Sequence, residues 1–121
     1  MRLLVSVADA DDAAAVLAGG ADLIDAKDPS RGALGAVSHA ALRAICSPVA
    51  GARPVTAALG DPRDVNAVEQ AARHAAESGV EFVKIGFDAT AHTSRVQALI
   101  AAAVRGTSRT STGVVAVAYA D

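Results

Sequence analysis

Tryptophan is absent from this sequence of 121 residues, and aromatic residues make up only 2% of it, although hydrophobic residues account for 52%. A core without large rings must be built from alanine, valine, leucine and isoleucine, which pack closely where helices lie against strands. The length is sufficient for one domain with a modest core. The composition therefore indicates a single globular domain of closely packed helices and strands.

Cysteine is equally scarce. The single Cys46 cannot form an internal disulfide, and its place in a predicted helix is typical of a small buried thiol. The three histidines, His39, His74 and His92, lie on or beside predicted helices without the spacing of metal ligands, so we expect them at the surface. We therefore expect neither a disulfide nor a bound metal or other cofactor.

Clusters of one charge and long apolar runs are also missing. The 11 basic and 13 acidic residues give a net charge of -2, and no basic patch marks a nucleic-acid binder, so nucleic acid is excluded as an expected partner. The opening MRLLVSVADADD has too short an apolar run for a signal peptide. No stretch approaches the roughly 20 apolar residues of a membrane helix. We expect a cytoplasmic protein that makes no contact with membranes.

Short β-branched or leucine-rich segments alternate with alanine-rich segments, a pattern typical of βα units around a parallel sheet. It predicts strands at residues 3–7, 22–26, 55–59, 82–85 and 114–118. It predicts helices at about residues 10–18, 39–46, 64–78 and 93–104. We expect Asp9 to cap the first helix and Asp61 the third, while the Gly19-Gly20 and Ser78-Gly79 pairs end the first and third helices.

Four βα units and a fifth strand correspond to the first half of a (β/α)8 barrel of TIM type, a fold of about 250 residues. An isolated half would leave two unpaired edges and an uncovered inner face. The sequence is therefore expected to be a fragment of a longer polypeptide or to be completed by another chain, as in a homo-oligomer. A small, open, doubly wound sheet is the alternative, although no glycine-rich fingerprint follows the first strand.

Two predicted strands end in lysine-containing sequences. The second ends with Asp25 and Lys27 on one face of the strand, and the fourth contains Lys84 in an otherwise apolar run. Ligands of parallel α/β folds gather at the carboxyl ends of strands, and each inner layer of a barrel is supplied by alternate strands. Lys27 and Lys84 are therefore predicted to lie near one another above the barrel core.

Two ammonium groups in a partly dry site lower each other's pKa, and a lysine that is partly uncharged can attack a carbonyl to form a Schiff base. The second lysine or Asp25 could then transfer protons. Asp25 could instead orient Lys27 by a charge-assisted hydrogen bond, which would raise the lysine pKa. In a purely structural interpretation, the lysines extend to solvent or pair with Asp28 and Glu81.

The segment after Lys27 reads DPSRGALGA. Gly32 and Gly35 permit conformations that expose backbone N–H groups, Ser30 supplies a hydroxyl and Arg31 a cation, so an anionic group such as a substrate phosphate could bind here. A plain turn also needs proline and glycine.

Five stretches, LLVSVADADDA, GGADLIDAKDPSRGALGA, VTAALGD, FVKIGF and VVAVAYAD, occur in the order found in a known family. Together they resemble the N-terminal half of (5-formylfuran-3-yl)methyl phosphate synthase, an enzyme of methanofuran biosynthesis. The pattern K-x-P-x-x-G-x-L-G-A is the most specific part. Ala118 stands where glycine is expected.

The resemblance implies a (β/α)8 barrel that condenses two molecules of glyceraldehyde 3-phosphate, with loss of phosphate and water and without a metal. By position, Lys27 would be the Schiff-base lysine and Lys84 the acid/base lysine, with Asp25 beside them. The family continues for about as many residues again, which would bring a further active-site lysine and the late loops that hold phosphate. Alternative functions are another Schiff-base sugar-phosphate aldolase, or a non-catalytic half barrel that binds a phosphorylated ligand or a partner chain.

Overall fold

A computed structural model of the chain describes residues 1–49, 51–61, 64–88 and 90–119. Within these residues the strands are β1 (Leu4–Val7), β2 (Leu23–Ala26), β3 (Val55–Ala58), β4 (Phe82–Phe87) and β5 (Gly113–Ala118). The helices are α1 (Ala10–Ala18), α2 (His39–Val49), α3 (Val65–Glu77) and α4 (Thr93–Thr107). A short 3-10 helix, η1 (Pro29–Arg31), follows β2 and was not predicted.

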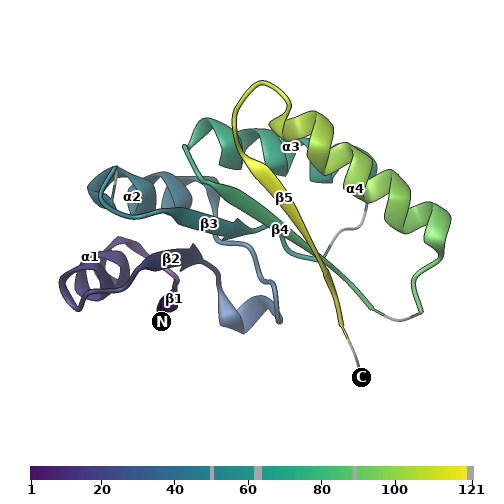
Figure 1. Cartoon of the computed structure of the whole chain (residues 1–121). Helices are drawn as coiled ribbons and strands as arrows, with labels where there is room; N and C mark the ends of the chain where they lie inside the picture. Colours follow the sequence, from purple (N-terminus) through teal and green to yellow (C-terminus); the bar gives the residue numbers. More distant parts are fainter. Residues whose placement is uncertain (50, 62–63, 89, 120–121) are drawn as a thin grey trace.

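The strands form one parallel sheet in the order β1-β2-β3-β4-β5, so that each strand pairs with the next one in the chain. The four α-helices follow one another along one side of this sheet (Figure 1). A doubly wound sheet reverses its strand order, whereas a barrel adds every strand at the same edge. The fold is therefore of the (β/α)8 type, with the predicted four βα units and fifth strand, and the doubly wound alternative is wrong.

Alternation along each strand separates a helix-facing side from an inner side. Ile24 and Ala26 of β2, Val83 and Ile85 of β4, and Ile45 of α2 are buried between the sheet and the helices. The predicted apolar face of α3 is confirmed, because Val68, Ala72, Ala75 and Ala76 are buried. The inner side carries, besides exposed apolar residues, the polar residues of β1 to β4 that form the site described below.

Two helices are longer than predicted. Helix α2 continues past Cys46 to Val49 and contains Pro48 in its last turn, where a proline removes only one late hydrogen bond. Helix α4 continues to Thr107 through Gly106. A Cβ at Gly106 would lie 2.5 Å from the Glu69 carbonyl oxygen, so this glycine permits the close approach of α3 and α4.

The predicted cap of α1 is confirmed, since the Asp9 carboxylate accepts a hydrogen bond from the Asp12 N–H at 2.9 Å. The predicted cap of α3 is wrong. The capping residue is Asp64, which accepts from the Ala67 N–H at 2.8 Å, whereas Asp61 lies before the cap and is exposed. The first and third helices end as expected, with Gly20 and Gly79 at φ of 87° and 88°.

Candidate functional site

Asp25 is the centre of a polar layer on the inner side of the sheet. The residue is only 1% exposed. The Thr56 hydroxyl of β3 donates to Asp25 Oδ1 at 2.6 Å, and the Ser6 hydroxyl of β1 donates to Asp25 Oδ2 at 3.3 Å. The β-sheet register places both hydroxyls directly opposite Asp25 on the two neighbouring strands.

Lys84 extends from β4 to the same carboxylate. Its Nζ lies 2.7 Å from Asp25 Oδ2, and its side chain is 18% exposed. The pair therefore spans β3 and joins two alternate strands, as an inner layer of a barrel does. A carboxylate that is removed from water and accepts from two hydroxyls and an ammonium group holds the Lys84 amine in one position.

Lys27 directly follows β2. Its backbone N–H donates to the Val7 carbonyl at 3.0 Å, which continues the parallel ladder and keeps Lys27 on the same side as Asp25. The side chain is partly buried, and its ammonium group makes no hydrogen bond or ion pair with the residues that the structure describes. The structure therefore pairs Asp25 with Lys84. The alternative prediction, that Asp25 orients Lys27 by a charge-assisted hydrogen bond, is wrong.

Ser6 and Thr56 were missed in the sequence. A serine and a threonine within short strands are ordinary strand residues, and only the register of the folded sheet brings their hydroxyls to Asp25. The alternation of side chains along each strand could have identified them, because Ser6 and Thr56 are polar residues at inward-facing positions on the two strands next to Asp25.

The loop after Lys27 folds upon itself. The Asp28 carboxylate accepts from the Ser30 hydroxyl at 2.6 Å and from the Ser30 N–H at 3.0 Å, and these bonds lower the Asp28 pKa. The Arg31 guanidinium donates to the Ala36 carbonyl at 3.1 Å. Ser30 and Arg31 are exposed, and their role in binding a substrate stays a prediction.

Two positions of this loop require glycine for the backbone conformation. Gly32 has a φ of 106°, in the region that L side chains rarely adopt. A Cβ at Gly35 would lie against the Asp28 carbonyl oxygen and 2.8 Å from the Arg31 Cβ, so the loop closes only around a glycine. The glycines therefore shape the loop, and their contact with a ligand stays a prediction.

Tyr119 is a further residue of the inner side that sequence reasoning did not select. It directly follows β5, and its N–H donates to the Phe87 carbonyl at 3.0 Å. Its ring packs on Gly86 of β4, which is two residues beyond Lys84. Burial, followed by the negative charge of Asp61, raises the pKa of the phenol. Its signal in the sequence was the same as that of Lys27, a polar residue just after a strand.

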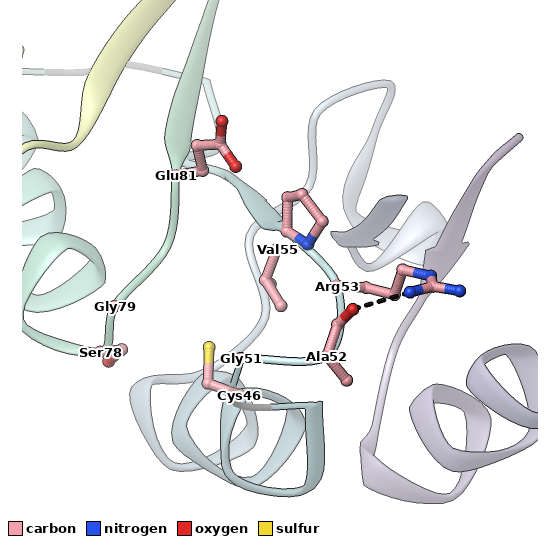
Figure 2. Close-up of a pocket in the computed structure, with 9 residues that line it drawn as sticks. Cys46, Gly51, Ala52, Arg53, Val55, Ser78, Gly79 and Glu81 are labelled. Atoms are coloured by element: carbon pink, nitrogen blue, oxygen red, sulfur yellow. Dashed lines mark hydrogen bonds between the residues drawn. The ribbon is translucent and has the colours of Figure 1, made fainter. Parts of the chain in front are cut away.

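The opposite end of the sheet has a hollow of about 430 Å³ beneath the start of β3 and β4 (Figure 2). Beside it, the Arg53 guanidinium donates to the Ala52 carbonyl at 2.9 Å and to the Ala21 carbonyl at 3.0 Å. The Cys46 thiol is partly buried, less than expected, and burial raises its pKa. Because ligands of this fold bind at the carboxyl ends, this hollow is not the candidate site.

His39, His74 and His92 are exposed, as predicted. Among the residues that the structure describes, no group of three or more His, Cys, Asp or Glu side chains is placed to hold a metal ion. In that same part of the chain, no helix combines the length and apolarity needed to cross a bilayer.

The family model described as 4-HFC-P synthase matches residues 3–121, which is nearly the whole chain. The chain belongs to the 4-HFC-P synthase family. The resemblance seen in the five sequence stretches is thereby confirmed, and it places Lys27, Asp25 and Lys84 within the matched region.

Among relatives of this 4-HFC-P synthase family member, the (5-formylfuran-3-yl)methyl phosphate synthase of Methanopyrus kandleri is 37% identical over 99% of the chain and 52% of its own length. A Methylorubrum extorquens protein given the same name provisionally is 49% identical over 69% of the chain and 35% of its own length. The chain spans about a third to a half of the length of these curated relatives.

A solved structure also resembles the family member. A protein of Burkholderia cenocepacia J2315, provisionally described as a phosphonomutase, matches 97% of the chain and 54% of its own length with a TM-score of 0.69. At 20% identity, this likeness shows the fold alone.

Proposed function

We propose that the protein is a (5-formylfuran-3-yl)methyl phosphate synthase of methanofuran biosynthesis, to which this chain contributes the first five strands and their lysines. The relatives' names support this activity. The Asp25–Lys84 pair on the inner side of the sheet is the single observation that carries it, because an amine held by a buried carboxylate suits proton transfer beside a second amine.

In the proposed reaction, two molecules of glyceraldehyde 3-phosphate are the substrates. The Lys27 amine attacks the aldehyde carbon of one molecule, and the carbinolamine loses water to give an imine. The Lys84 ammonium group donates a proton to the departing oxygen and, as the free amine, later accepts one from carbon, while Asp25 keeps the Lys84 amine in place. Ser30, Arg31, Gly32 and Gly35 are proposed to surround the phosphate of the substrate.

Borohydride reduction in the presence of glyceraldehyde 3-phosphate tests this assignment. We expect a stable adduct on the peptide that contains Lys27, no adduct on that peptide in Lys27→Ala, and a slower adduct at the same position in Lys84→Ala. Equal labelling of wild type and Lys27→Ala rejects Lys27 as the nucleophile. Identification of the product by mass and ultraviolet spectrum separates furan formation from another Schiff-base aldolase reaction.

A second candidate is a non-catalytic half barrel that pairs with another copy or chain. Apolar side chains on the inner side favour it, since Leu4 is 45% exposed, Phe82 37% and Val115 38%. Sedimentation of the purified chain tests this candidate. A dimer that traps no aldehyde supports it, whereas a monomer that forms the Lys27 adduct contradicts it.

A further inference from the structure

Tyr119 lies on the inner side of the sheet, farther than Lys84 toward the carboxyl ends of the strands, and its ring packs on Gly86. The register pairs Lys84 with Val115 and Gly86 with Val117, and the Tyr119 N–H continues this ladder at Phe87. The alternation of side chains therefore directs Tyr119 to the same side as Lys84 and Gly86.

The packing of the Tyr119 ring depends on the absence of a side chain at Gly86. A Cβ there would lie 2.5 Å from the phenol oxygen and 2.7 Å from Leu34 Cδ1. Leu34 belongs to the loop that begins after Lys27, so this loop and the end of β5 meet over β4. The phenol is thus held beside the elements that carry the proposed catalytic lysines.

The Tyr119 hydroxyl is buried and has no hydrogen-bond partner among the described residues. Buried polar groups in native proteins are almost always hydrogen-bonded, because leaving one unpaired away from water is destabilising. The hydroxyl therefore requires a partner from outside the described part of the chain. A bound ligand is one such partner.

A hollow of about 310 Å³ lies beside the phenol, lined by Asp61, Gly86, Asp88, Arg95 and Tyr119 among others. Burial and the Asp61 charge raise the phenol pKa, so the group keeps its proton at neutral pH and acts as a hydrogen-bond donor. The hollow opens at the carboxyl end of β4, where this fold places its ligands.

We propose that Tyr119 contacts the substrate, and that its O–H donates a hydrogen bond to an oxygen of the bound triose phosphate above Lys84. This inference rests on the proposed function and adds a binding residue to it. The competing explanation is that a protein group from another segment or chain accepts this hydrogen bond.

The binding test uses the Lys27→Ala chain, so that no imine forms. Tyr119 is the sole tyrosine and tryptophan is absent, which makes the tyrosine absorbance a direct probe of this site. We expect glyceraldehyde 3-phosphate to produce a saturable shift of that absorbance. Adding Tyr119→Phe should weaken the affinity, measured by calorimetry, by about fivefold, the value of one ordinary hydrogen bond.

The activity test compares Tyr119→Phe with wild type. We expect turnover to fall about 10- to 100-fold, as when one preorganised donor is removed, while the borohydride adduct on the Lys27 peptide persists. Gly86→Ala, which displaces the ring, should reproduce this loss.

The inference is overturned if Tyr119→Phe leaves both the affinity and the turnover unchanged. It is also overturned if Tyr119→Phe lowers only the stability of the chain, because the partner of the hydroxyl is then a protein group. Failure of the proposed function is distinct, because wild type would then yield neither adduct nor furan, while the affinity comparison would still decide the role of Tyr119.

Discussion

The Lys84 Nζ lies 2.7 Å from Asp25 Oδ2, although the two residues belong to strands that are not neighbours in the sheet. The intervening strand supplies Thr56, whose hydroxyl binds the other oxygen of the same carboxylate. A buried charge is tolerated only when it is paired and hydrogen-bonded. With the Ser6 hydroxyl of β1, which also donates to this carboxylate, four neighbouring strands are thus tied together through Asp25.

Replacing Lys84 by methionine should destabilise the chain by about 3 kcal/mol, because the Asp25 charge is left buried and unpaired. The free energy of unfolding from urea titration measures this change. The double variant Asp25→Asn with Lys84→Met should recover more than half of the loss, since no charge then remains buried. A double variant less stable than Lys84→Met would show that the ion pair is not what makes the single substitution costly.

Thr56→Val should cost about 1 to 3 kcal/mol, because valine has the shape of threonine but cannot donate to Asp25 Oδ1. Thr56→Ser is the matched control, as it keeps the hydroxyl and loses only a methyl group. Urea titrations of both variants give the comparison. Equal stability of Thr56→Val and wild type would mean that the 2.6 Å hydrogen bond contributes nothing measurable.

Most of the fold could be predicted from the sequence because each strand is a short apolar run bounded by punctuation. Gly19-Gly20 and Ser78-Gly79 marked helix ends correctly, since a residue with positive φ is needed there. Asp61 was misjudged because two aspartates precede α3 and only the folded loop shows that Asp64 has the capping geometry. The predicted ends of α2 and α4 were too early, because α2 continues through Pro48 and α4 through Gly106. Tertiary packing overrides the usual helix-breaking effect of these residues.

The candidate site was predictable only in part. Strand parity was enough to place Lys27, Asp25 and Lys84 on the inner side of the sheet. Parity does not say which cation a carboxylate will bind, and the choice of Lys84 over Lys27 depends on register and barrel stagger. Tyr119 was missed because the position of its ring depends on Gly86 of the neighbouring strand, where no side chain excludes the ring.

The contact between His39 and His74 predicts a loss of stability in acid. His39 Nε2 and His74 Nδ1 are 3.0 Å apart, and burial, followed by the charges of His74 and Arg43, lowers the His39 pKa from 6.5. The folded chain therefore binds this proton less tightly than the unfolded chain. The contribution of His39 to stability is complete above about pH 6.5 and is lost as the pH falls through the lowered pKa of the folded chain. Glu77 of α3 also lines the adjoining hollow.

The free energy of unfolding at pH 7.5 and 5.5 measures the effect in wild type and His39→Gln. We expect the acid loss to be smaller in His39→Gln, because glutamine can still hydrogen-bond to His74 but does not titrate. Since the pair is exposed and solvent screens it, the difference should stay below about 1 kcal/mol. An identical pH dependence in the two proteins would contradict the prediction.

Gly35→Ala should disrupt the loop after Lys27, because the new Cβ would meet the Asp28 carbonyl oxygen and the Arg31 Cβ. The Asp28 N–H donates to the Gly35 carbonyl at 2.9 Å, so relief of this clash breaks the bond that closes the loop. We expect faster amide exchange at Asp28 and at least a tenfold slower borohydride adduct on Lys27. Gly19→Ala is the matched control, since its Cβ would have no contact closer than 3.4 Å and its φ is -75°. If Gly35→Ala retains both the slow exchange and the adduct, the loop closes in some other way, and its glycine is no part of what positions Lys27.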